Sequence, residues 1–372
     1  MSGSGTVVHL LKGLGPGGAE RLLVAQLGAP SGFDHVVAYL VPEKRHLVPE
    51  LEEAGVAAIC LDGPRIARPG WIVRLRALLV ERRPVVVHVH SPAVAAVVRV
   101  LARTLRRRTR PVVLSTEHNR WPRHHRLTRL ANRLTIRAQP VTVAVSDDVK
   151  ASIRGTSAER VRVIVHGIDQ DAVRAMADRP GVRTELGIDE HEVLALCVAN
   201  LRREKALDML VESARLALGR SPALRFVLVG QGPLATELDG WIEAAGIGHR
   251  FTALGYRDDA PRLMSGADLF TLSSTHEGLP VAIMEALTLG LPVVATAAGG
   301  VPAAVGSAGI ITPIGDAAAL ADAQVSLAAD PARRRRLAEA ATREAERFAI
   351  TRAAAELEQL YRELSGGRHR YG

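Results

Sequence analysis

The sequence predicts an α/β protein with two doubly wound domains, each built on a parallel sheet. Apolar runs of strand length alternate with helical segments along nearly the whole chain, which is the pattern of repeated strand–helix–strand units. The length of 372 residues exceeds one typical domain and suits two. The alternation stops at a polar stretch with Pro180 and Gly181 and then restarts, so we expect the halves to join near residues 170–185.

Strand-forming runs and helical patterns follow one another in order through both halves. In the first half we expect strands at residues 7–11, 35–41, 57–61, 85–90, 112–116, 141–146 and 161–166, and helices at 18–27, 47–54, 71–81 and 127–137. The second half restarts with a strand at 193–198, a helix at 206–218 and a strand at 224–230. Aromatic residues make up only 3% of the chain, so the cores must consist mainly of Ala, Val and Leu.

The most informative stretch runs from Thr271 to Ala297. A short strand leads into a polar loop, and a helix begins at about Pro280, where proline suits the first turn. Glu277 lies in the loop and Glu285 on the helix, and Gly278 between them lets backbone amides approach a ligand. Because a helix N-terminus attracts anions, two flanking carboxylates suit a ligand with both phosphates and hydroxyls, such as a nucleotide sugar.

The string HEGLPVAIMEALTLGLPVVAT resembles the Glu-x7-Glu signature of retaining glycosyltransferases of family 4. The resemblance extends over nearly the whole chain and implies the GT-B fold, in which two Rossmann-like domains face each other across a cleft. It implies an acceptor-side domain at residues 1–170 and a nucleotide-sugar donor domain at 171–350. A last helix at 351–366, with one-sided apolar spacing, would dock back onto the first domain.

The segment from Val198 to Lys205 resembles the family segment in which an arginine and a lysine hold the donor diphosphate. Lys205 matches the lysine, whereas Asn200 occupies the usual arginine position, so Arg202 or Arg203 would have to supply that charge. Such a basic pair stabilises the charge that develops on the leaving diphosphate. The resemblance implies further donor contacts at Gly17, Gly18, Gly232, Glu277, Gly278, Leu279, Pro280 and Glu285, with Glu277 and Lys205 also taking part in catalysis.

A GxGxxG motif from Gly13 to Gly18 follows the first strand. By itself it is the dinucleotide fingerprint and would indicate an NAD-dependent oxidoreductase. The ribose-binding acid is poorly placed, because Leu40, Val41 and Pro42 precede Glu43. The longer string Gly-Gly-Ala-Glu-Arg resembles instead the family 4 glycine loop near the donor diphosphate and the acceptor, which makes Glu20 an acceptor-side residue unless it only complements the helix dipole.

Histidines lie within or shortly after two predicted strands of the first half. His88 and His90 alternate along one strand and share a face, but a zinc site would need further ligands, and the spacing shows no such set. His90 is either an acceptor-side residue or a core histidine. His118 matches a family histidine near the transferred sugar, where an imidazole can hydrogen-bond a sugar hydroxyl or the leaving group.

Asp169-Gln170-Asp171 has the form of a DxD metal motif. It directly follows His166-Gly167-Ile168, which resembles the Asn-Gly-Ile-Asp turn of the family with His in place of Asn. Asp171 can equally cap the helix that follows. We therefore expect no essential metal and no cofactor.

The net charge of +9 is concentrated between Arg99 and Arg137, a segment that contains twelve arginines and only one acid, Glu117. Such a face suits either a solvated surface or docking on anionic lipid at the cytoplasmic side of a membrane. Trp121 is the one aromatic residue there, which disfavours single-stranded nucleic acid. The N-terminal residues show no signal-peptide pattern, no run suits a transmembrane helix, and two cysteines fit a reducing cytoplasm.

The sequence thus predicts a retaining glycosyltransferase of the hexosyltransferase kind. It would move a hexose or N-acetylhexosamine from a nucleoside diphosphate sugar, UDP rather than GDP, to a hydroxyl of a lipid-linked glycan or a small metabolite. A GT-B nucleotide-sugar epimerase would use the same donor site without an acceptor. An NAD-dependent oxidoreductase and a non-catalytic sugar-binding module are the remaining alternatives.

Overall fold

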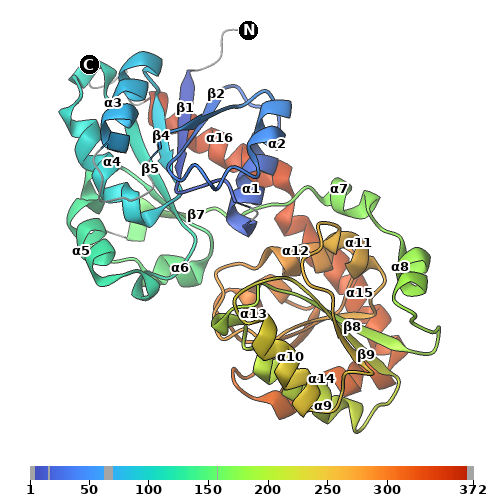
Figure 1. Cartoon of the computed structure of the whole chain (residues 1–372). Coiled ribbons are helices and arrows are strands. Elements are labelled where there is room, and N and C mark those ends of the chain that lie inside the picture. The colour runs from blue at the N-terminus through green and yellow to red at the C-terminus, as the bar shows by residue number, and fades with distance from the viewer. Residues whose placement is uncertain (1–4, 16, 63–69, 157, 367–372) are drawn as a thin grey trace. The chain divides into compact units, whose positions relative to one another are not determined.

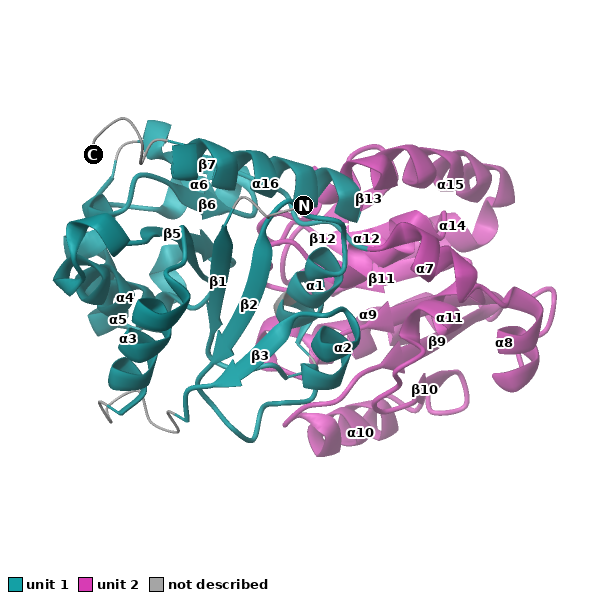
Figure 2. Cartoon of the chain, turned by 90° about the horizontal axis from the view of Figure 1, so that it is seen from above, with its two compact units in different colours: residues 1–168, 350–372 teal, residues 169–349 magenta. Residues whose placement is uncertain are grey.

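The computed structural model describes residues 5–15, 17–62, 70–156 and 158–366 (Figure 1). Residues 1–4, where the sequence shows no signal-peptide pattern, lie outside this part of the chain, as does Pro16 of the glycine loop. The chain divides into two compact units (Figure 2). Unit 1 comprises residues 1–168 with 350–372, and unit 2 comprises residues 169–349.

Unit 1 contains, within its described residues, a seven-stranded sheet in the order β3-β2-β1-β4-β5-β6-β7, with every pair parallel. The strands are β1 (Thr6–Leu11), β2 (Asp34–Tyr39), β3 (Ala57–Cys60), β4 (Val86–Val89), β5 (Val112–Glu117), β6 (Thr142–Ala144) and β7 (Val161–Val163). The helices are α1 (Gly18–Leu27), α2 (Val48–Glu53), α3 (Gly70–Arg82), α4 (Pro92–Thr104), α5 (Arg126–Thr135), α6 (Asp147–Ser152) and α16 (Ile350–Gly366).

Both faces of this sheet are covered by apolar packing. On one face, Trp71 and Leu75 of α3 pack with Val98 of α4 over β1, β2 and β4. On the other face, α16 returns from the end of the chain to this sheet (Figure 1). It buries Leu357 and Tyr361 in a cluster with strand residues of β1, β4, β5 and β6. Because only strands covered on both faces read as continuous apolar runs, this burial explains the Val-rich strands.

Unit 2 contains, among its described residues, a six-stranded parallel sheet in the order β10-β9-β8-β11-β12-β13. The strands are β8 (Val193–Val198), β9 (Leu224–Val229), β10 (Phe251–Ala253), β11 (Leu269–Leu272), β12 (Val293–Thr296) and β13 (Gly309–Thr312). The helices are α7 (Gln170–Ala175), α8 (Arg179–Glu185), α9 (Leu207–Leu218), α10 (Ala235–Ala244), α11 (Ala260–Ser265), α12 (Val281–Thr288), α13 (Val301–Val305), α14 (Ala317–Ala329) and α15 (Pro331–Ala345).

The predicted fold class, two Rossmann-like doubly wound units, is confirmed. The bounds predicted for α1 and β8 agree with the structure. Helix α4 was not predicted, because its Val-rich sequence favours a strand by propensity although it folds as a helix. The predicted basic helix at 127–137 is α5 followed by a short 3-10 segment, Ile136–Ala138.

In each sheet the strand order reverses beside the first strand of the unit, between β1 and β4 in unit 1 and between β8 and β11 in unit 2. The connections on either side of such a point leave toward opposite faces of the sheet, so the carboxyl ends of the two strands are left open to a ligand. Ligand-binding residues are therefore expected at these two edges. In the described part of the chain, no helix is long and apolar enough to cross a membrane.

Candidate active site

The switch point of unit 2 brings together Lys205 and Glu277, two residues that the sequence placed after different strands. The Lys205 Nζ lies 2.5 Å from Glu277 Oε1, and the side chains are only 16% and 11% exposed. Ser274 Oγ donates a second hydrogen bond to the same carboxylate oxygen, at 2.5 Å. The partial burial makes this charge pair stronger than an exposed one, since solvent screens it less.

Backbone contacts hold the two loops that carry this pair. Ser273 Oγ donates to the Lys205 carbonyl at 2.7 Å, and the Thr275 amide donates to the Glu204 carbonyl at 2.8 Å. Ala206, which follows the lysine, has φ 46°, a left-handed conformation that is uncommon for a residue with a Cβ atom. This turn ends the short 3-10 segment Arg203–Lys205 and begins α9.

Glycines permit the close approach of the neighbouring loops in unit 2. A Cβ atom on Gly232 would lie 2.4 Å from the Leu201 carbonyl oxygen, so only glycine fits without a shift of the loop after β8. Gly299 has φ 54°, and a Cβ there would lie 2.0 Å from the Glu277 carbonyl oxygen. The structure thus gives Gly232 a packing role in shaping the edge of the sheet.

The predicted helix start near Pro280 is confirmed, with Pro280 as the N-cap residue and α12 beginning at Val281. Glu285 lies on α12 and is half-buried, and Gly278 and Leu279 lie in the half-buried loop that precedes it. The first amides of a helix have no partners within the helix and point outward along its axis. The loop after β11 therefore presents backbone donors together with the Glu277 carboxylate.

Arg202 and Arg203 follow β8 and are exposed, as is Asn200, the residue at the position where the family resemblance implied an arginine. Both arginines precede the half-buried Lys205 by two or three positions. Two exposed cationic side chains thus lie close to Lys205 in the sequence, whereas Asn200 contributes no charge.

At the switch point of unit 1, the glycine loop follows β1. A Cβ on Gly13 would lie 2.7 Å from the Lys44 Cβ, so this glycine makes room for the loop after β2. The Glu20 side chain folds back over Gly17, since a Cβ there would lie 2.4 Å from Glu20 Oε2. Burial raises the pKa of Glu20 above its ordinary value, against the effect of its backbone hydrogen bond and of Lys44. Gly18 begins α1.

A chain of histidines crosses the same unit. His9 Nδ1 lies 3.1 Å from His90 Nε2, and His9 Nε2 lies 3.0 Å from His35 Nδ1. His88 contacts the Tyr361 hydroxyl and Thr116 Oγ1, each at 2.6 Å. Only His88 and His90 of this group were singled out from the sequence, because strand pairing, which places His9 beside His88, cannot be read from spacing along the chain.

His118, the predicted site histidine, lies directly after β5 and stacks on His166, with ring centroids 4.9 Å apart. Its Nδ1 lies 3.1 Å from His166 Nε2, and its ring centroid lies 6.0 Å from that of His90. Among the described residues nothing bonds to the buried His118 Nε2. The structure thus places His118 and His90 near each other at one edge of the sheet, with a ring nitrogen of His118 left for another partner.

Burial lowers the pKa of all six of these imidazoles. The pKa of His88 falls to about 3 and that of His166 to about 4, in both cases mainly through burial. The remaining four, His9, His35, His90 and His118, are also shifted down by burial first, with neighbouring histidines adding to the effect on three of them. The rings are therefore neutral at pH 7 and carry lone pairs on nitrogen.

One arginine of the predicted basic face is not on the surface. Arg99 is 1% exposed and donates to Gln139, Asn132 and Ser115, at 2.8, 2.7 and 3.1 Å. The one acid of that stretch, Glu117, is also buried, which raises its pKa to about 7 although Arg99 opposes the shift. The basic face thus consists of the other arginines, which are exposed or half-buried.

The prediction that Asp171 caps a helix is wrong. Asp169 is the N-cap of α7 and accepts a hydrogen bond from the Ala172 amide at 2.9 Å. The Asp171 side chain is 97% exposed and pairs with Arg174 at 3.3 Å. Both acids of the DxD string thus have local roles at the start of a helix.

Two family models match the chain in succession. Glycosyltransferase Family 4 matches residues 16–172, and Glycosyl transferases group 1 matches residues 178–344. Together they cover most of both units and include Gly17, Gly18, Lys205, Glu277 and Glu285. The chain belongs to family 4 of the glycosyltransferases and is a glycosyltransferase of GT-B fold.

Among similar proteins is an alpha-D-kanosaminyltransferase of Streptomyces kanamyceticus, 28% identical over 79% of this chain and 81% of that one. The lipopolysaccharide core biosynthesis mannosyltransferase LpsB of Rhizobium meliloti is 27% identical over 90% of this chain and 94% of that one. Among solved structures, Anabaena HepE in complex with UDP and glucose has a TM-score of 0.81 at 21% identity and covers 95% of this chain and 98% of its own. That last likeness supports the fold.

The buried histidines predict that unit 1 loses stability in mild acid. Their folded pKa values lie below the ordinary value of 6.5, so between pH 7 and about 4 the unfolded chain binds more protons and stability falls as pH falls. Each such histidine changes the free energy of unfolding by up to about 1.4 kcal/mol per pH unit in that window. Glu117 and Glu20, whose pKa values burial raises, act in the opposite direction, but they are two groups against six histidines.

This dependence is measured by urea unfolding at pH 7.5, 6.5 and 5.5. We expect His166→Gln to reduce the slope of stability against pH, whereas His46→Gln, which changes an exposed histidine, leaves it unaltered. A free energy of unfolding that stays constant from pH 7.5 to 5.5 would contradict the burial of neutral imidazoles.

Proposed function

We propose that the protein is a retaining glycosyltransferase that takes a hexose or N-acetylhexosamine from a nucleoside diphosphate sugar, with UDP as the favoured nucleotide. The observation that supports this most directly is the half-buried pair of Lys205 and Glu277 at the switch point of unit 2. It provides a cation for a diphosphate and a carboxylate for sugar hydroxyls, from adjacent strands of one sheet.

In this proposal the donor diphosphate binds Lys205 Nζ and the backbone amides of Gly278 and Leu279, in the loop that precedes α12. The carboxylate of Glu277 holds the lysine in place before the donor arrives, at 2.5 Å. The diphosphate then competes for the ammonium group, which leaves the carboxylate to accept hydrogen bonds from the sugar. Arg202 and Arg203, both exposed, supply the further charge that Asn200 cannot.

Glu285, on α12, is the proposed partner of the ribose hydroxyls, because a carboxylate can accept from two neighbouring hydroxyls at once. Gly232 shapes the turn beside the nucleotide. Preference for UDP is supported by the fold relative Anabaena HepE, whose crystal structures include complexes with UDP and with UDP-glucose.

The acceptor hydroxyl is proposed to bind unit 1, near Glu20, His90 and His118. The bond between the anomeric carbon and the β-phosphate oxygen breaks while the acceptor oxygen bonds to the same face of that carbon. The departing phosphate takes the acceptor proton, so no enzyme carboxylate needs to act as nucleophile. The charge that develops on the phosphate is balanced by Lys205 and the loop amides of Gly278 and Leu279, so this step needs no metal ion.

Substitutions in unit 2 test this assignment. We expect Lys205→Ala to lower kcat/KM for the donor about 100- to 1,000-fold, the usual loss when a charge-stabilising donor is removed. Glu285→Ala should mainly raise the donor KM, about 10- to 100-fold, since a hydrogen bond donated to a charged group is worth ~1.5–3 kcal/mol. Release of nucleoside diphosphate with a hydroxyl acceptor is the readout.

The matched control is Arg215→Ala, which removes an exposed ion pair with Glu212 on α9 and should leave transfer unchanged. Full activity of folded Lys205→Ala and Glu285→Ala would exclude the proposed site. Turnover of the donor without any acceptor, giving an epimerised nucleotide sugar, would favour the epimerase instead.

We further propose that unit 1 docks on an anionic membrane through α5, which suits a lipid-linked acceptor. Leu127, Leu130 and Leu134 are 70%, 55% and 73% exposed. Their spacing of three and four residues places them on one side of the helix, and Arg126 and Arg133 are exposed on the adjoining side. Exposed leucines next to arginines are typical of helices that lie in the headgroup region.

Sedimentation with vesicles tests this docking. We expect binding to vesicles that contain anionic phosphatidylglycerol, weakened by salt, and loss of most of it in Leu127→Ser/Leu134→Ser. Ile314→Ser, which changes an exposed apolar residue of unit 2, is the control and should bind like the unaltered protein. Equal sedimentation with neutral and anionic vesicles, or none with either at low salt, would refute the proposal.

A further inference from the structure

We propose that His9, His88 and His90 form a binding site in unit 1 for a divalent transition metal ion of the zinc type. One ring nitrogen from each of the three histidines lies within 4.8 Å of the other two. The site lies in a different unit from Lys205 and Glu277, and it does not depend on the proposed donor chemistry.

Strand pairing creates the triad. His9 on β1 and His88 on β4 are register partners in the parallel ladder, and His90 follows His88 on the same face of the sheet. Only His88 and His90 can be grouped from their spacing in the sequence, because His9 lies on the other strand of the switch point. Two of the three positions lie on strands in the sheet core, so their backbones are fixed.

The spacing already approaches that of a tetrahedral site. Zinc–nitrogen bonds of about 2.0–2.1 Å place two nitrogens of a tetrahedral site roughly 3.3–3.4 Å apart. His9 Nδ1 and His90 Nε2 are 3.1 Å apart, and the rings of His88 and His90 have centroids separated by 4.1 Å. The ring nitrogen of His88 lies within 4.8 Å of the other two, so this ring must move toward them for all three nitrogens to reach one ion.

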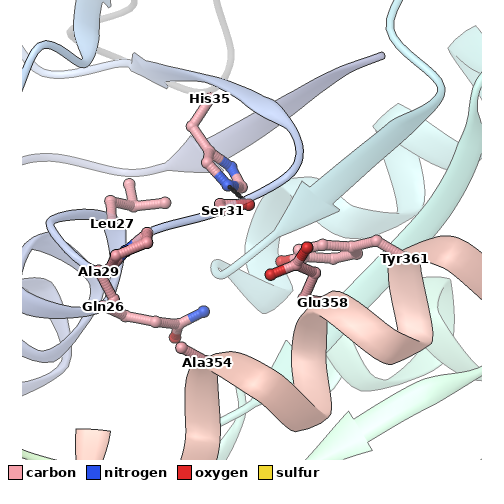
Figure 3. A pocket seen from close by; sticks show the side chains of 9 residues that line it. Gln26, Leu27, Ala29, Ser31, His35, Ala354, Glu358 and Tyr361 are labelled. Carbon is pink, nitrogen blue, oxygen red and sulfur yellow. Dashed lines mark hydrogen bonds between the residues drawn. The ribbon is translucent and has the colours of Figure 1, made fainter. Parts of the chain in front are cut away.

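The neighbours of the triad suit the hydrogen bonds that orient metal-bound histidines. His9 Nε2 lies 3.0 Å from His35 Nδ1, and His35 Nε2 lies 3.0 Å from Ser31 Oγ. If these nitrogens donate outward along the chain, the His9 Nδ1 lone pair faces His90, as in metal-bound histidines whose other nitrogen donates to a partner. Figure 3 shows His35 and Ser31 beside Tyr361 and Glu358 on the wall of a small pocket of unit 1.

Metal binding would break some of the hydrogen bonds that the three histidines make. The ion must replace the His9–His90 hydrogen bond and one of the two partners of His88, Tyr361 or Thr116, while the other continues to orient the ring. Three neutral imidazoles are sufficient protein ligands for zinc, with a water in the fourth position. The competing arrangement is a metal-free network of hydrogen-bonded histidines.

Cobalt and zinc titrations of the whole chelator-treated protein distinguish the two arrangements. We expect one Co²⁺ to bind per chain and to show the visible absorption of four-coordinate cobalt. Zn²⁺ should displace it and bind with a Kd of about 1 μM or tighter. His9→Gln and His90→Gln should each weaken binding at least about 100-fold, because loss of even an outer-shell partner costs 10- to 100-fold. His46→Gln, at an exposed position, should leave binding unchanged.

Two results would overturn the proposal. One is the absence of a four-coordinate cobalt spectrum in the unaltered protein, which decides the matter even if a variant fails to fold. The other is binding of unaltered strength in the folded double variant His9→Gln/His90→Gln, which would place the ion elsewhere. A transferase assay is not needed for either outcome, so failure of this proposal is distinct from failure of the proposed function.

Discussion

The reversal of strand order in a parallel sheet is the constraint on which the candidate sites depend. At that point the connections leave toward opposite faces, and the carboxyl ends of two strands remain uncovered. The reversal between β8 and β11 lets Lys205 and Glu277 meet although they are far apart in the chain. The reversal between β1 and β4 places the glycine loop and His90 at one edge of unit 1.

The ionisable groups at the two edges differ in their charge state: those of unit 2 form an ion pair, and those of unit 1 are neutral. In unit 2 a cation and a carboxylate neutralise each other in a partly exposed place, where an anionic ligand can still compete for the cation. In unit 1 the six clustered imidazoles are buried or half-buried and neutral, because a buried charge without a partner is costly. Arg99 is the exception, and several side-chain acceptors together with the nearby Glu117 compensate its burial.

Much of the fold could be predicted, because strand and helix periods are local properties of the sequence. The loop from Glu277 to Pro280 and the helix that follows were also predictable, since glycine and proline define them locally. The ion pair of Lys205 with Glu277 and the pairing of His9 with His88 could not be predicted, because both depend on which strands lie side by side. Arg99 looked like a surface residue because composition does not distinguish a buried arginine from an exposed one.

The central claim is that unit 2 binds a nucleoside diphosphate at Lys205, Glu277 and Glu285. Thermal unfolding of the whole protein with UDP, GDP, dTDP, ADP and NAD tests it most directly, because a ligand of the native state raises the apparent stability. The account predicts that a nucleoside diphosphate, UDP above the others, raises Tm and that Glu285→Ala abolishes the shift. A shift with NAD alone would contradict it.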